Sequence, residues 1–381
     1  MEPVKPSLEL LRGLTDEHVL SALMRQHRMT RAELATETGL SKPTTGESVR
    51  RLSESGIVVD TGERSAGGRG RGRVASYYAL AADTGVALAL SIAPEGIVAE
   101  CVDAYGDVVA RAEQKVERPA RPQAAATAVS RALVGVRRQV TQPIRLAVVS
   151  AAGPVDRTTD RLIEVPDQAF LLGELDPAEL LAADVAGPIA VDNDVNWAAR
   201  AERDNAPELR DFAYVFLGEG LGCAIVSDRQ VRQGYAGMAG EISHLITTGP
   251  DGSATRLIEV FAQLGLRQPD STAIDVDRLL SRIRADEPAG SELRRALGDA
   301  VRGTLAAIVA LTDPETVIVG GPWGSDPVVL EAIVDAASDL PRPVPVRAAA
   351  LTAEPALTGA RSEALQQLRA AIIAGATPTS T

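Results

Sequence analysis

Hydrophobic and polar positions follow two different patterns along the chain, and the change lies near residue 80. Before it, apolar residues recur every three or four positions in short segments that end at glycine. After it, runs of consecutive apolar residues alternate with segments of helical spacing. Helical spacing places apolar residues on one face of a helix, whereas continuous apolar runs are typical of buried strands. The pattern therefore predicts a helical domain at residues 1–80 and an α/β domain at residues 81–381.

Three helices are expected in the N-terminal domain. The first starts near Thr15, and the second opens with a capping box formed by Thr30 and Glu33 and ends at Gly39. Ser41 is the predicted N-cap of the third helix. The residues expected to face the core are Val19, Leu20, Leu23, Val49 and Leu52. Two short helices joined by a tight turn with glycine form a helix-turn-helix, a motif that binds DNA.

The third helix supplies the candidate DNA contacts. In a helix-turn-helix the second helix of the pair lies in the major groove. We expect its polar residues to face the bases, namely Ser41, Lys42, Thr44, Thr45 and Ser48. Arg50, further along the same helix, is expected to contact phosphate.

A β-hairpin is predicted after the three helices, with strands starting at residues 57–59 and returning at 74–80. The tip between them carries arginines interleaved with glycines: Arg64, Arg69, Arg71 and Arg73. A cationic tip can follow a phosphate backbone or enter a minor groove. A solvated loop is the alternative interpretation. The position directly after a helix-turn-helix favours a DNA-contacting wing, with Arg69 and Arg71 as the contacts.

Strands and helices alternate in the second domain. Strands are predicted at residues 85–92, 96–103, 107–112, 144–149, 188–191, 212–217, 223–226 and 316–319. Helices are predicted at residues 123–141, 274–280, 291–311 and 327–337. Residues 372–381 are small and polar, and we expect them to be frayed.

Polar residues gather where several of these strands end. Asp192, Asn193 and Asp194 follow one strand, and a glycine-rich stretch further along carries Glu241 and His244. Open α/β folds bind ligands at the carboxyl ends of their strands. Two plainer interpretations stay open. One of the three polar residues is explained as a helix N-cap, and the glycine-rich stretch could be a strand–turn–strand with ordinary surface residues.

Several of these motifs resemble the ROK family of bacterial sugar kinases and sugar-responsive repressors. The similar segments read AAGPVD from residue 151, NDVNWAARAE from residue 193, and GEGLG from residue 218 with GYAGMAGEISH after it. The resemblance implies an actin-like (ribonuclease-H-like), two-lobed ROK domain behind a winged helix-turn-helix. It also implies sugar contacts at Gly153, Asn193, Asp194, Glu241, His244 and Glu259.

The chain departs from the family's kinases at the ATP phosphates. The family's D-x-G-G-T corresponds here to Ser91, Ala93 and Glu95, and its second phosphate loop contains Glu219. Carboxylates at these places would repel a triphosphate, because phosphate sites need amides and hydroxyls. The sequence therefore predicts no use of ATP and no cofactor. The family's zinc-binding cysteines are also missing between His244 and Glu259, so no metal is expected, and a structural histidine stays open as the alternative to a ligand contact at His244.

Charge and composition add to this assignment. The net charge is −12, but the first 80 residues hold 12 Lys and Arg against 10 Asp and Glu. A slightly basic head on an acidic body fits DNA binding by the head alone. Cys101 and Cys223 fit neither a disulfide framework nor a zinc spacing. Without a long apolar run or a signal pattern, we expect a cytoplasmic protein that has no membrane segment.

Taken together, the sequence predicts a transcriptional regulator. The head binds operator DNA as part of a homodimer or homotetramer, and the body senses a sugar or sugar phosphate; repression is favoured over activation. Two alternatives stay open. One is an ATP-dependent sugar kinase with a DNA-binding head, and the other is a DNA-binding regulator whose pocket is vestigial.

Overall fold

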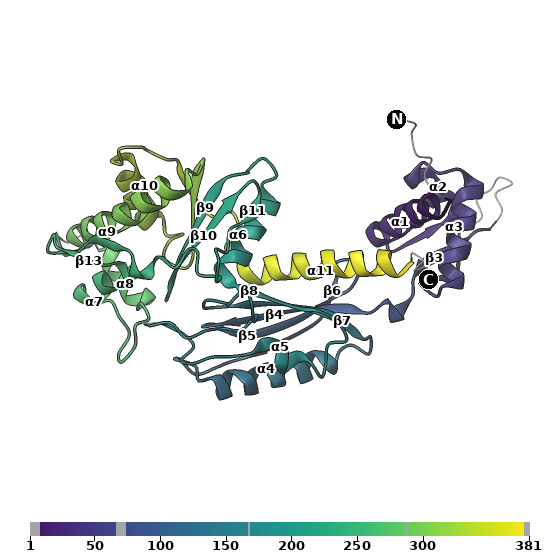
Figure 1. Cartoon of the computed structure of the whole chain (residues 1–381), viewed down its shortest axis with the longest axis horizontal. Helices are drawn as coiled ribbons and strands as arrows, with labels where there is room; N and C mark the ends of the chain where they lie inside the picture. The colour runs from purple at the N-terminus through teal and green to yellow at the C-terminus, as the bar shows by residue number, and fades with distance from the viewer. Residues whose placement is uncertain (1–7, 66–73, 167, 286–287, 377–381) are drawn as a thin grey trace.

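The computed structural model describes residues 8–65, 74–166, 168–285 and 288–376, which form a head and a two-lobed body (Figure 1). The head lies at one end of the molecule and the second lobe at the other. The C-terminal helix α11 (Pro355–Ala376) extends from the body to the head. This arrangement confirms a winged helix-turn-helix joined to an actin-like body.

The head consists of three helices and a small antiparallel sheet with the strand order β1-β3-β2. Its elements are α1 (Leu8–Gln26), β1 (Arg28–Thr30), α2 (Arg31–Thr38), α3 (Lys42–Glu54), β2 (Val58–Arg64) and β3 (Ser76–Leu80). The predicted start of the first helix near Thr15 is wrong. The helix begins at Leu8, and its early leucines stay about half exposed, so they give no buried periodicity.

The predicted ends of the second and third helices are confirmed in atomic detail. The Thr30 hydroxyl accepts from the Glu33 amide at 3.3 Å, and the Glu33 carboxylate accepts from the Thr30 amide at 2.7 Å. Gly39 ends α2 with a φ of 69°, a conformation that glycine adopts without strain. Ser41 caps α3 by accepting from the Thr44 amide at 3.3 Å. These contacts are local, which is why the sequence predicts them.

The first lobe is a five-stranded mixed sheet with the order β6-β5-β4-β7-β8. Its elements are β4 (Val86–Ala93), β5 (Gly96–Val102), β6 (Val108–Gln114), α4 (Pro122–Arg137), β7 (Ile144–Ala151), α5 (Pro177–Leu181) and β8 (Ile189–Asn193). Helix α4 covers one face and α11 the other (Figure 1). Helix α4 ends at Arg137, before the predicted residue 141, and the Gln139 side chain beyond it donates to the Arg111 carbonyl at 2.8 Å.

The second lobe holds another five-stranded sheet, in the order β11-β10-β9-β14-β15, and a two-stranded one. Its strands are β9 (Phe212–Leu217), β10 (Leu221–Ser227), β11 (Gln230–Val231), β12 (Ile246–Thr248), β13 (Ala254–Arg256), β14 (Thr316–Gly320) and β15 (Val346–Ala348). Its helices are α7 (Leu257–Gln263), α8 (Val276–Ile283), α9 (Pro288–Thr312) and α10 (Pro327–Ser338). Helix α6 (Asp194–Asn205) follows β8 and packs against α11 and β10, so it contacts both lobes.

Helix α11 corrects the prediction of a frayed end. It is helical as far as Ala376, and Ile372 is only 8% exposed. Residues 377–381, the rest of the segment predicted to fray, lie outside the described residues. Ile372 belongs to a buried cluster that also contains Leu23 of α1 and Trp197 of α6. The last helix is therefore held by packing that its local sequence does not reveal.

None of the helices in the described part of the chain is both long and apolar enough to span a membrane.

Candidate functional site

A cavity of about 130 Å³ lies between the two lobes. Residues from the ends of β7 and β8 line one side, and residues from β10 and the loop that leads to Glu241 line the other. At roughly 10–15 Å³ of this volume per water, the cavity has room for about ten waters. That is enough for a molecule the size of a monosaccharide. Its place at the carboxyl ends of the β7 and β8 strands is where α/β folds bind ligands.

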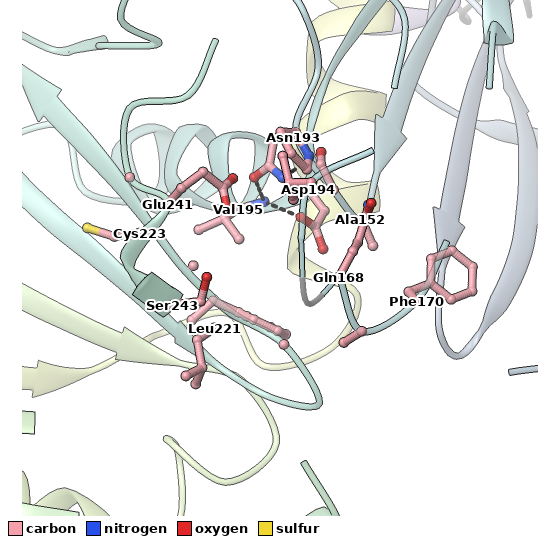
Figure 2. Close-up of a pocket in the computed structure, with 18 of the residues that line it drawn as sticks. Ala152, Gln168, Phe170, Asn193, Asp194, Val195, Leu221, Cys223, Glu241 and Ser243 are labelled. Atoms are coloured by element: carbon pink, nitrogen blue, oxygen red, sulfur yellow. Dashed lines mark hydrogen bonds between the residues drawn. The ribbon is translucent and has the colours of Figure 1, made fainter. Parts of the chain in front are cut away.

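Asn193 and Asp194 enter the cavity where β8 passes into α6. Figure 2 shows both side chains with their bonds to the Val195 amide, each 2.9 Å long. The Asn193 side-chain nitrogen also donates to the Gly153 carbonyl at 2.9 Å. The structure thus brings three predicted sugar contacts together. Asn193 is the helix N-cap, so that plainer interpretation is correct for this residue and leaves Asp194 free for a ligand.

Asp192 has a structural role instead. It is 5% exposed and accepts from the side chains of Asn196 and Gln233, each at 2.8 Å. Arg200 approaches the same carboxylate to 2.6 Å. Because both of its carboxylate oxygens are bonded within the protein, Asp192 holds the start of α6 in place rather than facing the cavity.

Burial dominates the electrostatics of the cavity carboxylates. Burial raises the pKa of Asp194 from 3.8 to about 7; the Val195 amide opposes this shift, and the charges of Glu95 and Glu241 add to it. Burial also raises the pKa of Glu241, and His244 acts in the opposite direction. The charged forms are disfavoured because they lose water without gaining a cation. The site therefore holds carboxylates that a ligand with donor groups would stabilise.

His244 and Glu259 do not line this cavity, although they were predicted to complete the ligand set. His244 Nε2 lies 3.2 Å from the Pro166 carbonyl, and its Nδ1 lies 3.4 Å from the Arg256 guanidinium. Arg256 also donates to Glu259 at 3.0 Å, and Arg267 donates to the same carboxylate at 3.2 Å. These four side chains form a polar cluster beside the cavity, in which Arg256 and Arg267 both pair with Glu259.

The region that corresponds to the kinases' phosphate loops has a contact of its own. Glu219, in the turn between β9 and β10, forms an ion pair with Arg118 of the first lobe. Glu95, in the turn between β4 and β5, also lines the cavity. Both carboxylates therefore line the same cavity, and Glu219 has a cationic partner in Arg118.

Gln168 lines the cavity and was not among the predicted contacts. Both polar atoms of its amide are buried and have no hydrogen-bond partner. It comes from an irregular loop between β7 and α5, so no periodic pattern in the sequence marks it.

A metal site would need several ligating side chains close together. In the described ranges, no group of three or more His, Cys, Asp or Glu is arranged to bind one.

On the predicted recognition helix α3, two of the five candidates for base contacts are wrong. Thr45 and Ser48 are both 0% exposed. The Thr45 hydroxyl donates to the Ser41 carbonyl at 3.1 Å, and the Ser48 hydroxyl donates to Asp16 of α1 at 2.5 Å. They share a helical face with the core residue Val49, which turns them toward α1. Sequence composition marked them as polar but not as buried.

The remaining candidates on this helix are accessible. Ser41 and Lys42 are exposed, and Thr44 is half-buried. Arg50 is exposed and forms ion pairs with Glu47 and Glu54, each at 2.5 Å. These carboxylates raise the pKa of Arg50 and compete with phosphate for its charge. Within the described residues, Lys42 has no ion pair, so its charge is more available to a phosphate than that of Arg50.

The predicted wing is present as the antiparallel pair of β2 and β3, and Arg64 and Ser76 are the last residues that pair in it. Arg69 and Arg71, the predicted DNA contacts on that tip, lie outside the described residues. Arg64, at the end of β2, is exposed and pairs with Asp60 at 3.0 Å.

Comparison with known proteins supports the same two parts. Residues 88–365 match the ROK family, and residues 14–59 match winged helix-turn-helix DNA-binding domains. The chain is similar to a glucokinase from Streptomyces coelicolor, with 28% identity over 268 residues that cover 62% of this chain and 82% of the relative.

Two solved structures have similar folds. The first is a ROK family transcriptional regulator described as a homologue of the E. coli MLC protein, with a TM-score of 0.61 and 16% identity, covering 95% of this chain and 99% of that one. The second is a ROK family glucokinase from Streptomyces griseus in complex with glucose and AMPPNP, with a TM-score of 0.56 and 22% identity, covering 74% of this chain and 100% of that one. At these identities the likeness concerns the fold, and only the regulator extends over the head. Since the family match spans more than half of its length, the chain belongs to the ROK family.

Proposed function

We propose that this protein is a sequence-specific transcriptional regulator, acting as a repressor in the cytoplasm, whose body senses a sugar and thereby changes the operator affinity of the head. The head would comprise residues 1–80 and the sensing and oligomerisation domain residues 81–381. Asn193, Asp194 and Glu241 would bind the sugar, with Gly153 supporting them. Ser41, Lys42 and Thr44, together with Arg50, Arg69 and Arg71, would contact DNA.

One observation carries this proposal: a single helix, α11, contacts both the sugar cavity's helix and the DNA-binding head. At one end, Gly359 lies against the Trp197 carbonyl of α6, where a Cβ atom would come within 2.0 Å. At the other end, Leu368 and Ile372 share a buried cluster with Leu23 of α1. Because α6 begins at Asp194, a ligand that moves α6 also moves the support of the head.

Polar contacts fix the head on the body at the same place. Arg369 of α11 donates to the carbonyls of Ala104 at 2.8 Å and Tyr105 at 3.0 Å, and to that of Met24 in the head at 3.4 Å. The rings of His27 and Tyr105 stack at 4.5 Å, and the Tyr105 hydroxyl accepts from the Leu80 amide at 3.0 Å. Because the junction between head and body is packed in this way, a small rotation of α11 would rotate the head with it.

In an assembly of two or four copies, paired heads must match half-sites about one helical turn apart. A ligand that binds one arrangement of the lobes more tightly shifts the population toward it. Operator affinity then falls because the spacing of the heads no longer fits. This step needs no chemistry at the cavity.

The alternative of a sugar kinase is supported by the relatives that are glucokinases and by Asp194, which could accept a hydroxyl proton. Against it stand Glu95 and Glu219 at the places of the phosphate loops. A coupled assay with ATP and hexoses decides between them, and ATP-dependent phosphorylation above background would favour the kinase.

The regulator is tested by fluorescence anisotropy with promoter DNA from beside its own gene. The full-length protein should bind the duplex, and one member of a sugar panel should change its affinity. The same panel in a thermal-shift assay should raise the melting temperature, because a ligand stabilises the form it binds. If DNA is bound and no sugar has any effect in either assay, the pocket is vestigial and the sensing role is wrong.

A further inference from the structure

The charge of the cavity restricts the kind of sugar it can take. Four carboxylates line it, those of Glu95, Asp194, Glu219 and Glu241. Among the described residues that line it, none is lysine, arginine or histidine. A sugar phosphate would place two negative charges beside these carboxylates with no cation to receive them.

Only one of the four carboxylates has a cationic partner in the described part of the chain. Glu219 is paired with Arg118. Within those ranges, Asp194 accepts only from backbone amides, those of Val195 and of Asp194 itself, and neither Glu95 nor Glu241 makes a side-chain hydrogen bond or ion pair. Glu95 is exposed, whereas Asp194 and Glu241 are partly buried, and removing a charge from water without a partner is costly. The mutual repulsion is visible in Asp194, whose pKa is raised by burial and by the charges of Glu95 and Glu241.

A second, independent feature indicates a ligand at the same place. Gln168 presents an amide oxygen and an amide nitrogen to the cavity, and both are buried and have no partner among the described residues. Buried polar groups are almost always satisfied in native proteins. One acceptor beside one donor matches a hydroxyl group, which can donate to the first and accept from the second. The unpaired amide of Gln168 therefore fits a ligand with several hydroxyl groups. The negative charge of the cavity carboxylates fits a ligand that is also a cation.

We propose that the effector is an unphosphorylated amino sugar, whose ammonium group lies against Glu95 and Asp194 and whose hydroxyls bond to Glu241 and Gln168. This inference rests on the proposed sensing function and specifies its ligand. The ammonium supplies the charge that the protein itself lacks, and it gives strong, charge-assisted hydrogen bonds to the carboxylates. N-acetylation would remove that charge, and a 6-phosphate would add repulsion.

The test uses isothermal titration calorimetry on the full-length protein at pH 7. The ligands are D-glucosamine, D-mannosamine and D-galactosamine, each compared with its parent hexose, its N-acetyl form and its 6-phosphate. One amino sugar should bind at least about ten-fold more tightly than its three counterparts, because charge-assisted bonds are roughly twice as strong as neutral ones.

Two variants with the same change of charge locate the effect. Glu95→Gln should bring the affinities for the amino sugar and its parent hexose to within about three-fold of each other, as expected when one of two carboxylates is neutralised. Glu208→Gln, at an exposed position away from the cavity, should keep the wild-type preference. Gln168→Leu should weaken all sugars alike, because its role does not depend on the ammonium. The melting temperature of each variant reports whether it is folded.

The outcomes separate this inference from the proposed function. A neutral sugar or a sugar phosphate that binds as tightly as its amino counterpart and still changes DNA affinity overturns the ligand class and leaves the regulator intact. An amino-sugar preference that survives in Glu95→Gln overturns the assigned ammonium site. If nothing in the panel binds, both the inference and the sensing function are wrong.

Discussion

Carboxylates in the head and carboxylates in the cavity have opposite surroundings. Asp16, buried between α1 and α3, accepts from Arg51 at 2.7 Å and from Ser48 at 2.5 Å. Asp194, partly buried in the cavity, accepts from backbone amides alone among the groups that the structure describes. The first arrangement stabilises the fold, because removing either partner leaves a buried charge alone. The arrangement around Asp194 costs stability, so this carboxylate is better explained by ligand binding than by a contribution to the fold.

The largest effect expected from this comparison is that of Asp16→Ala. Loss of the carboxylate leaves Arg51 and Ser48 without their partner and separates α1 from α3. We expect a loss of about 2–3 kcal/mol in the free energy of unfolding, below the roughly 3–5 kcal/mol of a fully buried pair, because Arg51 is 23% exposed. Urea unfolding followed by circular dichroism measures it.

The matched control for that variant is Glu47→Ala. Glu47 pairs with Arg50 on the exposed surface of the same helix. Exposed ion pairs contribute little, so no change in the unfolding midpoint is expected. Equal effects of the two substitutions would contradict the structural role of Asp16.

Asp194→Asn should raise the free energy of unfolding at high pH, whereas Asp16→Ala lowers it. The folded-state pKa of about 7 lies above the ordinary 3.8, so the folded protein holds this proton more tightly than the unfolded chain does. The resulting stability is fully present below about pH 4 and is lost as the pH rises to about 7. The variant should therefore be more stable than the wild type at pH 8, by a few kcal/mol at about 1.4 kcal/mol per pKa unit.

Urea unfolding at pH 5 and pH 8 checks this sign, with Asp251→Asn as the exposed control. Burial raises the pKa of Glu241 as well, so the variant should reduce the pH dependence without removing it. Asp194→Asn should also abolish the stabilisation by a bound sugar. A variant that still responds fully to the sugar would show that the ligand lies elsewhere.

Arg369→Ala tests the link between the two regions. The substitution removes the bonds to Ala104, Tyr105 and Met24 but touches neither the cavity nor α3. We expect sugar binding and DNA binding to stay within about two-fold of the wild type, while the effect of sugar on DNA affinity falls several-fold. Anisotropy titrations with and without the sugar measure both quantities. An unchanged response would mean that α11 does not carry the coupling.

The smallest effect is expected at single DNA contacts. Lys42→Ala, and likewise Arg69→Ala or Arg71→Ala, should weaken DNA binding modestly and lower the slope of log K against log salt by about one. Ser48→Ala should leave that slope unchanged, because its hydroxyl bonds to Asp16 and not to DNA. A reduced slope for Ser48→Ala would contradict its assignment to the core.

Local chemistry explains what could be predicted. The capping box of α2, the glycine that ends it and the N-cap of α3 involve residues within a few positions of each other. The apolar runs that form β4, β7 and β9 needed no knowledge of their neighbours. Asn193 and Asp194 could be found because their strand ends there and parallel strands end at one edge of a sheet.

Contacts between distant segments explain what could not be predicted. Strand β1 has only three residues and exists through its pairing with β3. Thr45 and Ser48 lie four residues before the core residues Val49 and Leu52, so helical spacing already placed them on the buried face of α3, and only their polarity led to the wrong assignment. Glu259 is a different case: Arg256 lies only three residues before it, so this ion pair is local, and the resemblance alone had assigned Glu259 to the ligand.

By itself, the sequence determined the two-part organisation, the order of most strands and helices, and the carboxylates that enter the cavity. Those follow from periodicity and from interactions a few residues apart, which any stretch of chain carries with it. Only the tertiary structure decided which of the carboxylates are neutralised, that Gln168 faces the cavity, and that α11 joins the cavity to the head. Each of these depends on groups brought together across the lobes, where burial and the presence or absence of a partner set the free energy of a polar side chain.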